Sequence, residues 1–189
     1  MRRAVFIDRD GTLVREKHYL ADPDQLELYP GSLEALRLLR GTGLALILVS
    51  NQSGVARGLF PEAQVAVIHS RLAAMLAQAR VALDGVYYCP HHPQAAVAAY
   101  RRDCDCRKPR PGMLLAAARD HDLELAGSWV VGDKRDDIEL GRSLGLGALL
   151  VRTGHGRNAA QGLESGEALA VCDDLLAAAR WICARETPS

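Results

Sequence analysis

The chain has 189 residues, of which 49% are hydrophobic and 24% are charged, and its 23 basic residues balance its 23 acidic ones. This length and composition predict one folded domain over residues 1–189 and exclude a disordered or fibrous chain. The zero net charge argues against a protein that binds nucleic acid or an acidic membrane surface, because both tasks need a basic excess. Only three of the basic residues are lysines, at positions 17, 108 and 134.

The sequence also bears on the compartment. No segment approaches the roughly 20 consecutive apolar residues that a membrane-spanning helix needs. The first eight residues carry charges where a secretory signal would have its apolar stretch. The five cysteines are therefore expected to be metal ligands or reduced core thiols rather than disulfides. We expect a cytoplasmic protein and, since no apolar surface stripe is evident, a monomer.

Short apolar segments alternate with segments of helical periodicity along the whole chain. We expect strands at residues 3–8, 44–50, 85–88, 128–132, 148–152 and 168–172. We expect helices at residues 33–41, 61–79, 113–122, 135–144 and 173–184, with Ser32 as the N-cap of the first. Residues 89–110 show no regular pattern. Nearly apolar strands separated by helices predict an α/β fold, in which helices cover both faces of a parallel sheet.

Polar clusters follow three of these strands. In a parallel sheet covered by helices, ligands bind beyond the carboxyl ends of the strands. The clusters are Asp8-Arg9-Asp10-Gly11-Thr12, Ser50-Asn51-Gln52-Ser53-Gly54 and Gly132-Asp133-Lys134. We therefore expect the functional site at this edge of the sheet.

The first cluster gives the strongest signal. Asp8 and Asp10 are two carboxylates at one strand end, which is costly unless a cation or a proton lies between them. Gly11 allows a tight turn whose backbone amides can face an anion. An ordinary strand-to-loop turn is the alternative. A calcium loop is excluded, because the glutamate that it needs six residues after the glycine is replaced by Lys17.

The other clusters add the groups that bind phosphate. The hydroxyl of Ser50 and the amide of Asn51 could hold phosphate oxygens, and Lys108 precedes a predicted helix. Asp133 follows a buried strand. Taken singly, Ser50 and Asp133 could be helix caps and Lys108 a surface residue. Together they supply a nucleophile, a metal site and two phosphate anchors.

With these four motifs the sequence resembles the haloacid dehalogenase superfamily of phosphotransferases, over essentially the whole chain. The resemblance implies a Rossmann-like sheet, Mg²⁺ dependence and a covalent aspartyl-phosphate. It implies that Asp8 is the nucleophile and Asp10 the general acid and base, while Ser50 and Lys108 bind the transferring phosphoryl group. Asp133 would hold Mg²⁺ with Asp8 and the backbone carbonyl of Asp10. Such a metal suits the reaction, because the attacking carboxylate and the phosphate repel one another.

A cysteine and histidine motif predicts a second metal. Its ligands are Cys89, His91, Cys104 and Cys106. Three thiolates and one imidazole suit tetrahedral Zn²⁺, and four protein ligands predict a closed structural site in a zinc loop, residues 89–106. The alternatives are free thiols, or His92 in place of His91. Since Cys106 directly precedes Arg107 and Lys108, we expect zinc to fix the segment that presents both cations.

The loop lengths predict a capless enzyme. Neither residues 10–32 nor residues 51–108 leave room for a folded cap domain once their expected elements are placed. The substrate must then be enclosed by loops, for which residues 16–19, residues 53–57 and the zinc loop are the candidates.

Within the superfamily, the motifs resemble the D-glycero-D-manno-heptose 1,7-bisphosphate 7-phosphatase family, which acts in ADP-heptose and lipopolysaccharide core synthesis. The residues that carry this resemblance are Asp-Arg-Asp-Gly-Thr, Ser-Asn-Gln-Ser-Gly-Val-Ala-Arg-Gly, Tyr-Tyr-Cys-Pro-His-His-Pro and Cys-Asp-Cys-Arg-Lys-Pro. The resemblance implies substrate contacts by Glu16, Lys17, His18, Tyr19, Ser50, Asn51, Gln52 and Ser53. Arg107 is the candidate for the second phosphate, since a guanidinium can form two parallel hydrogen bonds. Lys134 directly follows the expected Mg²⁺ ligand.

Other functions remain as alternatives at this point. Histidinol-phosphate phosphatase shares the motifs and the zinc loop. A zinc-stabilised binding module with a decayed acidic site is a distant alternative, although every catalytic residue is present. A phosphoryl carrier or mutase would need a further domain to shelter its intermediate from water. We assign no role to His69, His121 and His155, and expect Cys172 and Cys183 to be core thiols.

Overall fold

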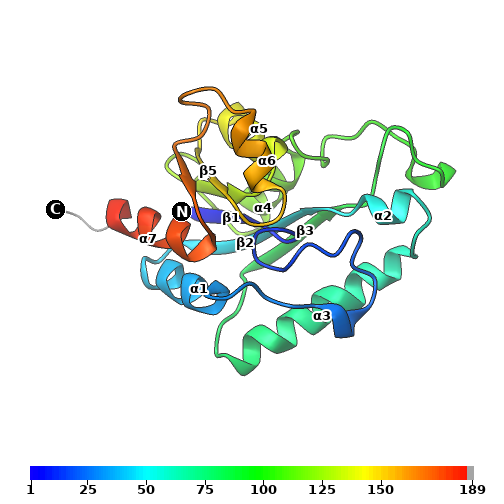
Figure 1. The fold of residues 1–189 in the computed structure, drawn as a ribbon, viewed down its shortest axis with the longest axis horizontal. Helices are drawn as coiled ribbons and strands as arrows, with labels where there is room; N and C mark the ends of the chain where they lie inside the picture. The colour runs from blue at the N-terminus through cyan, green and yellow to red at the C-terminus, as the bar shows by residue number, and fades with distance from the viewer. Residues whose placement is uncertain (187–189) are drawn as a thin grey trace.

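The computed structural model describes residues 1–186. Six strands form one sheet in the order β3-β2-β1-β4-β5-β6, and all five pairings are parallel (Figure 1). The strands are β1 (Ala4–Asp8), β2 (Ala45–Asn51), β3 (Gly85–Cys89), β4 (Trp129–Gly132), β5 (Gly147–Val151) and β6 (Ala170–Cys172). The α/β class and all six predicted strands are confirmed, with ends that shift by at most two residues or so.

Helices cover both faces of this sheet (Figure 1). They are α1 (Ser32–Gly41), α2 (Ser53–Ala56), α3 (Glu62–Gln78), α4 (Gly112–Asp120), α5 (Arg135–Ser143), α6 (Gly156–Gln161) and α7 (Leu175–Glu186), with the 3-10 helices η1 (Pro23–Gln25) and η2 (Ala98–Tyr100). Helices α1, α3 and α7 pack on one face, and α4, α5 and α6 on the other. Among the described residues, no helix is long and apolar enough to cross a membrane.

Strand β1 shows why the strands are almost wholly apolar. Val5 and Ile7 pack into the core cluster shared with α1, α3 and α7. Ala4 and Phe6 point to the opposite face and pack against α4. All four are completely buried, and full burial of a side chain such as Ile7 contributes about 1.5–3 kcal/mol. Both faces of this central strand are buried, and its only polar residue is the last one, Asp8, which is also buried.

Two local expectations change. Ser32 is not the N-cap of α1: Gly31 takes that position with a φ of 79°. Ser32 is instead the first helical residue, and its buried hydroxyl donates to the carbonyl oxygen of Leu13 at 3.0 Å. Helices α2 and α6 were not predicted from the sequence, because each has at most six residues and begins directly after a strand or its loop. Within the described chain, the segments after β1 and β2 hold no cap domain.

Candidate active site

Two aspartates meet at the carboxyl edge of the sheet. Strands β1 and β4 pair in parallel with Ile7 opposite Val131, so Asp8, which ends β1, and Asp133, which follows β4, meet at the same edge of the sheet. Carboxylate oxygens of Asp8, Asp133 and Asp137 lie within 4.8 Å of one another, and all three residues are buried. The Oδ2 of Asp8 and the Oδ1 of Asp133 have no hydrogen-bond partner. Buried carboxylate oxygens without donors are costly, so this donor set fits a hard divalent cation such as Mg²⁺.

The electrostatics of these carboxylates support the same interpretation. Burial, followed by the charge of Asp8, raises the pKa of Asp133 to about 8. Burial also raises the pKa of Asp8, although the charge of Lys108 opposes that rise. A bound cation favours the ionised carboxylates and so reverses both effects.

The ammonium group of Lys108 is fully enclosed at this centre. It donates to Asp8 Oδ1 and to Asp137 Oδ1, both at 2.6 Å, and to the carbonyl oxygen of Val49 at 3.1 Å. Burial lowers the pKa of this group, but the charges of Asp137 and Asp8 outweigh burial and raise the pKa overall. Lys108 therefore stays a cation at the site, as the sequence predicts for a phosphate anchor.

Three of the predicted residues form one hydrogen-bonded group. The side-chain amide of Gln52 donates to Asp10 Oδ2 at 2.8 Å and to the hydroxyl of Ser50 at 2.6 Å. Gln52 therefore links Asp10, the expected general acid, to Ser50, whose hydroxyl is expected to bind phosphate. The Gln52 side chain is buried, and both bonds donated by its amide go to these two residues, so its geometry is that of a support for Asp10 and Ser50.

The predicted zinc ligands converge. Cys106 Sγ lies 3.1 Å from Cys89 Sγ, 3.3 Å from Cys104 Sγ and 3.4 Å from His91 Nδ1. Cys89 Sγ lies 3.5 Å from Cys104 Sγ and 3.7 Å from His91 Nδ1. Thiolates about 2.3 Å from a tetrahedral Zn²⁺ would stand about 3.8 Å apart, so a small expansion of the cluster fits the metal. Burial and the neighbouring thiol of Cys106 raise the pKa of Cys89, which a cation would offset.

His92 is not part of that cluster. Its Nδ1 accepts a hydrogen bond from the backbone amide of Gln94 at 3.0 Å. The backbone carbonyl of His91, by contrast, accepts from the guanidinium of Arg107 at 3.3 Å. The backbone of His91, a predicted zinc ligand, therefore helps to position Arg107, the residue predicted to bind the second phosphate.

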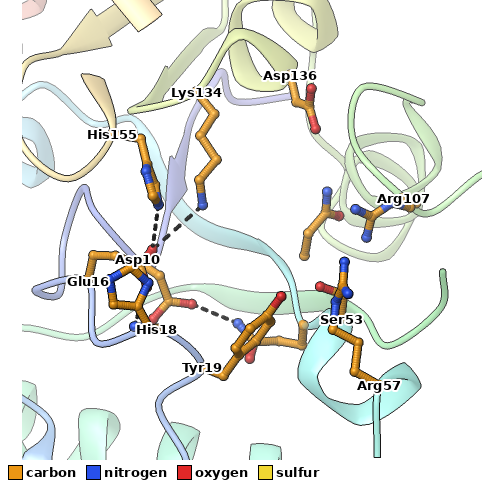
Figure 2. Close-up of a pocket in the computed structure, with 12 residues that line it drawn as sticks. Asp10, Glu16, His18, Tyr19, Ser53, Arg57, Arg107, Lys134, Asp136 and His155 are labelled. Atoms are coloured by element: carbon orange, nitrogen blue, oxygen red, sulfur yellow. Dashed lines mark hydrogen bonds and ion pairs between the residues drawn. The ribbon is translucent and has the colours of Figure 1, made fainter. Parts of the chain in front are cut away.

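A cavity of about 350 Å³ opens beside these groups (Figure 2). A smaller pocket of about 20 Å³, lined in part by Asp8, Ser50 and Lys108, shares four lining residues with it. The predicted site residues that line the larger cavity are Asp10, Glu16, His18, Tyr19, Asn51, Gln52, Ser53, Arg107 and Lys134. Lys17 lines neither space: its ammonium group pairs with Glu27 at 3.4 Å.

Charged side chains from different parts of the chain line opposite sides of this cavity. Figure 2 shows Lys134 and His155 on one side and Arg57 and Arg107 on the other. Glu16 joins the first pair, because its Oε2 lies 3.7 Å from Lys134 Nζ and 3.4 Å from His155 Nε2.

Several functional residues were not identified from the sequence. Asp137 is one of them, and its carboxylate completes the acidic cluster. The backbone amide of His155 donates to Asp133 Oδ2 at 2.8 Å. Arg57 lies in the predicted substrate loop at residues 53–57, although it had no role of its own; it faces the cavity with its guanidinium 5.8 Å from the centre of the Tyr19 ring. The one available signal for Asp137 was its place in the first turn of the helix that begins directly after Asp133 and Lys134.

Comparison with known proteins identifies the family. A family model described as HAD-hydrolase-like matches residues 105–178. D-glycero-β-D-manno-heptose-1,7-bisphosphate 7-phosphatase of Escherichia coli (strain K12) is 46% identical over 152 residues, 80% of each chain. The chain belongs to the heptose-1,7-bisphosphate 7-phosphatase family. The relative of the same name from Pasteurella multocida (strain Pm70) is 44% identical over 155 residues, 82% of this chain and 84% of its own.

The structures of this family agree with the fold. D,D-heptose 1,7-bisphosphate phosphatase from B. bronchiseptica, in complex with magnesium and phosphate, has a TM-score of 0.84 and 36% identity. The match covers 97% of this chain and 99% of that one. The predicted resemblance to the haloacid dehalogenase superfamily, and within it to the heptose-1,7-bisphosphate 7-phosphatase family, is confirmed.

Proposed function

We propose that this protein is a Mg²⁺-dependent phosphatase that removes the 7-phosphate of D-glycero-D-manno-heptose 1,7-bisphosphate, in ADP-heptose and lipopolysaccharide core synthesis. The observation that carries the proposal is the pairing of two cationic regions. Lys108 lies in the small pocket beside Asp8, and Arg57 and Arg107 line one wall of the adjoining cavity. A sugar with a phosphate at each end needs both regions, and the names of the relatives support that substrate class.

The first step is attack by Asp8 on phosphorus. Lys108 donates to the Oδ1 of Asp8, so the orientation of the attacking carboxylate is fixed. The bond from Asp8 to phosphorus forms as the ester bond to the sugar oxygen breaks, which gives an aspartyl-phosphate. Lys108 and the hydroxyl of Ser50 stabilise the charge that gathers on the phosphoryl oxygens.

Asp10 would move the proton in both halves of the reaction. Protonated, it gives its proton to the departing sugar oxygen; ionised, it takes a proton from the water that attacks the aspartyl-phosphate. That second attack releases inorganic phosphate and restores Asp8. The carboxylate of Asp10 lines both the small pocket and the cavity, which suits a group that serves substrate and water in turn.

The two metals have separate tasks. Asp8, Asp133 and the backbone carbonyl of Asp10 would hold Mg²⁺, whose charge offsets the repulsion between Asp8 and the substrate phosphate. Cys89, His91, Cys104 and Cys106 would hold a structural Zn²⁺. Thiolate ligands stay reduced in a reducing compartment, which supports a cytoplasmic enzyme.

Phosphate release from the two candidate substrates tests the proposal. We expect kcat/KM with Mg²⁺ to be at least about 100-fold higher for heptose 1,7-bisphosphate than for histidinol phosphate, because only the former can use Arg57 and Arg107. The reverse preference would assign the protein to histidinol-phosphate phosphatases. No phosphate release from either, with Asp8→Asn as the blank, would favour a binding module.

A further inference from the structure

Arg9 is a buried cation that the proposed mechanism does not use. Its side chain is 1% exposed. Its Nε donates to Asp10 Oδ1 at 3.0 Å, and its Nη2 lies 2.8 Å from Asp10 Oδ2 and donates to Gln52 Oε1 at 3.0 Å. The remaining amino group, Nη1, lies 3.2 Å from Nε2 of His69. A buried guanidinium needs every one of these partners, since an unpaired buried charge is strongly destabilising.

His69 must be the acceptor in its contact with Arg9. An arginine guanidinium has only donors, so Nε2 of His69 accepts and the ring proton sits on Nδ1. Burial and the charge of Arg9 lower the pKa of His69 to about 4, so the ring is neutral at physiological pH. The ring lies on α3 and meets the ring of Tyr88 edge-on at 5.6 Å. The imidazole is therefore fixed on both sides.

We propose that His69 is a positioning residue for Asp10, which it reaches through Arg9. Arg9 binds both oxygens of the Asp10 carboxylate, but it has four rotatable bonds of its own. His69 and Gln52 fix the far end of the guanidinium, and Arg9 in turn sets the plane of the carboxylate. His69 does not line the substrate cavity, so it acts from behind Asp10. The inference rests on the role of Asp10 as proton donor in the proposed function.

The side chain of Asp10 explains why such support matters. It is 16% exposed at the wall of the cavity, where a free carboxylate would rotate among several positions. A proton donor must lie within hydrogen-bond distance of the leaving oxygen. Misplacement by about 1 Å can reduce turnover about 100-fold.

The test compares two substrates with different leaving groups. The comparison distinguishes a defect in proton donation from a general loss of activity. A sugar oxygen must be protonated as it leaves, whereas 4-nitrophenolate leaves without a proton. Because kcat/KM reports the steps up to the aspartyl-phosphate, a misplaced donor lowers it for the sugar phosphate and spares it for 4-nitrophenyl phosphate. We expect His69→Leu to lower the sugar phosphate to aryl phosphate ratio of kcat/KM at least about tenfold.

Two further variants keep the test decisive. His69→Gln retains an acceptor for Arg9 and should restore the ratio to within about threefold of wild type. His121→Leu is the matched control, since His121 meets Tyr87 edge-on at 6.2 Å but does not contact Arg9 in the structure. It should leave the ratio unchanged. A ratio that stays at the wild-type value in His69→Leu overturns the inference.

Asp10→Asn distinguishes this inference from the proposed function. If Asp10→Asn lowers kcat/KM equally for the sugar phosphate and for 4-nitrophenyl phosphate, Asp10 is not the proton donor and the proposed mechanism fails. If Asp10→Asn lowers the ratio but His69→Leu does not, the mechanism stands and only the positioning role is wrong. Should heptose 1,7-bisphosphate not be a substrate, the same ratio can be measured with another alkyl phosphate that the wild type hydrolyses.

Discussion

The side chain of Asn51 holds the backbone of Lys108 at two points. Its Nδ2 donates to the carbonyl oxygen of Lys108 at 3.1 Å, and its Oδ1 accepts from the Lys108 amide at 3.0 Å. Asn51 ends β2, whereas Lys108 lies 57 residues later, two residues after the end of the zinc loop. The sheet therefore fixes Lys108, the proposed phosphate-binding residue, from one side, and the zinc loop fixes it from the other.

Removing this clamp should weaken both stability and turnover. Asn51→Ala leaves the backbone amide and carbonyl of Lys108 without partners, which costs about 1–3 kcal/mol for a buried group. We expect kcat to fall about tenfold to 100-fold, because the ammonium group of Lys108 loses its fixed position. Urea unfolding and steady-state kinetics measure the two effects. The exposed Asn158→Ala should change neither, and an unaltered kcat in Asn51→Ala would show that the zinc loop alone positions Lys108.

The parts of the site that lie at strand ends could be predicted from the sequence. Asp8, Ser50 and Asp133 each follow a run of apolar residues, and the parallel sheet brings such positions to one edge. The cysteine and histidine cluster could be predicted equally well, because its residue types and spacing are typical of a zinc site. Each of these predictions depends only on short local patterns.

The contacts between distant side chains could not be predicted. Arg9 and His69 are 60 residues apart, and no periodicity links them. Lys17 was expected among the substrate contacts on the strength of the resemblance, but the loop turns its ammonium group toward Glu27. Such contacts depend on how loops and α3 pack over the strand ends, which a single sequence does not specify. The short helix α6 was missed for the same reason, since packing rather than propensity stabilises a helix of this length.

Arg107 should discriminate between one and two phosphates. We expect Arg107→Ala to raise KM for heptose 1,7-bisphosphate about tenfold to 100-fold, because a charge-assisted hydrogen-bonded pair is lost. A simple monophosphate should be affected by no more than about twofold. Arg107→Lys keeps the charge without the bidentate geometry and should fall between the two. An equal rise in KM for the bisphosphate and for the monophosphate would mean that Arg107 does not bind the second phosphate. It would favour a monophosphate as the natural substrate.

Zinc removal should lower stability and activity together. Cys104→Ala opens the four-ligand cluster, and the loss of a structural metal costs about 4 kcal/mol or more. Turnover should fall as well, because the carbonyl of His91 then no longer holds Arg107. Thermal unfolding, zinc content and kinetics on the same preparation check this. Cys172→Ala, outside the cluster, should retain the zinc and lose about 1 kcal/mol. Zinc-free protein with unchanged melting and kinetics would contradict the structural role.

Gly11 should be required for its lack of a side chain rather than for its backbone angle alone. Its φ is +91°, and a Cβ there would lie 2.1 Å from Asp133 Oδ2. We expect Gly11→Ala to displace the Asp133 carboxylate and abolish Mg²⁺-dependent turnover. Gly43 is the matched control, because its φ is +83° and a Cβ would meet nothing within 4 Å. Gly43→Ala should cost about 1–2 kcal/mol of stability and leave kcat intact. Equal kcat values in the two variants would rule out the steric explanation.

The metal-free protein should lose stability as the pH rises toward 8. The pKa of Asp133 in the folded chain is raised to about 8 by burial and by the charge of Asp8, and burial also raises that of Asp8. Below about pH 8 the folded protein therefore binds protons that the unfolded chain has already released. The free energy of unfolding therefore falls as the pH rises, because the folded state must give up protons that the unfolded chain no longer holds. Urea unfolding in a chelator at about pH 6 and pH 8 measures the difference.

Mg²⁺ binding should show the opposite pH dependence. The cation needs ionised carboxylates, so it must displace the proton held by Asp133, whose pKa is raised to about 8, and its affinity should rise by up to about tenfold per pH unit. Titration calorimetry between about pH 6 and pH 8, in two buffers of different ionisation enthalpy, measures both the affinity and the protons released. Asp136→Asn is the control, because Asp136 lines the same pocket but lies outside the acidic cluster; it should keep the dependence. A flat Mg²⁺ affinity over this range would mean that Asp133 is already ionised in the metal-free protein.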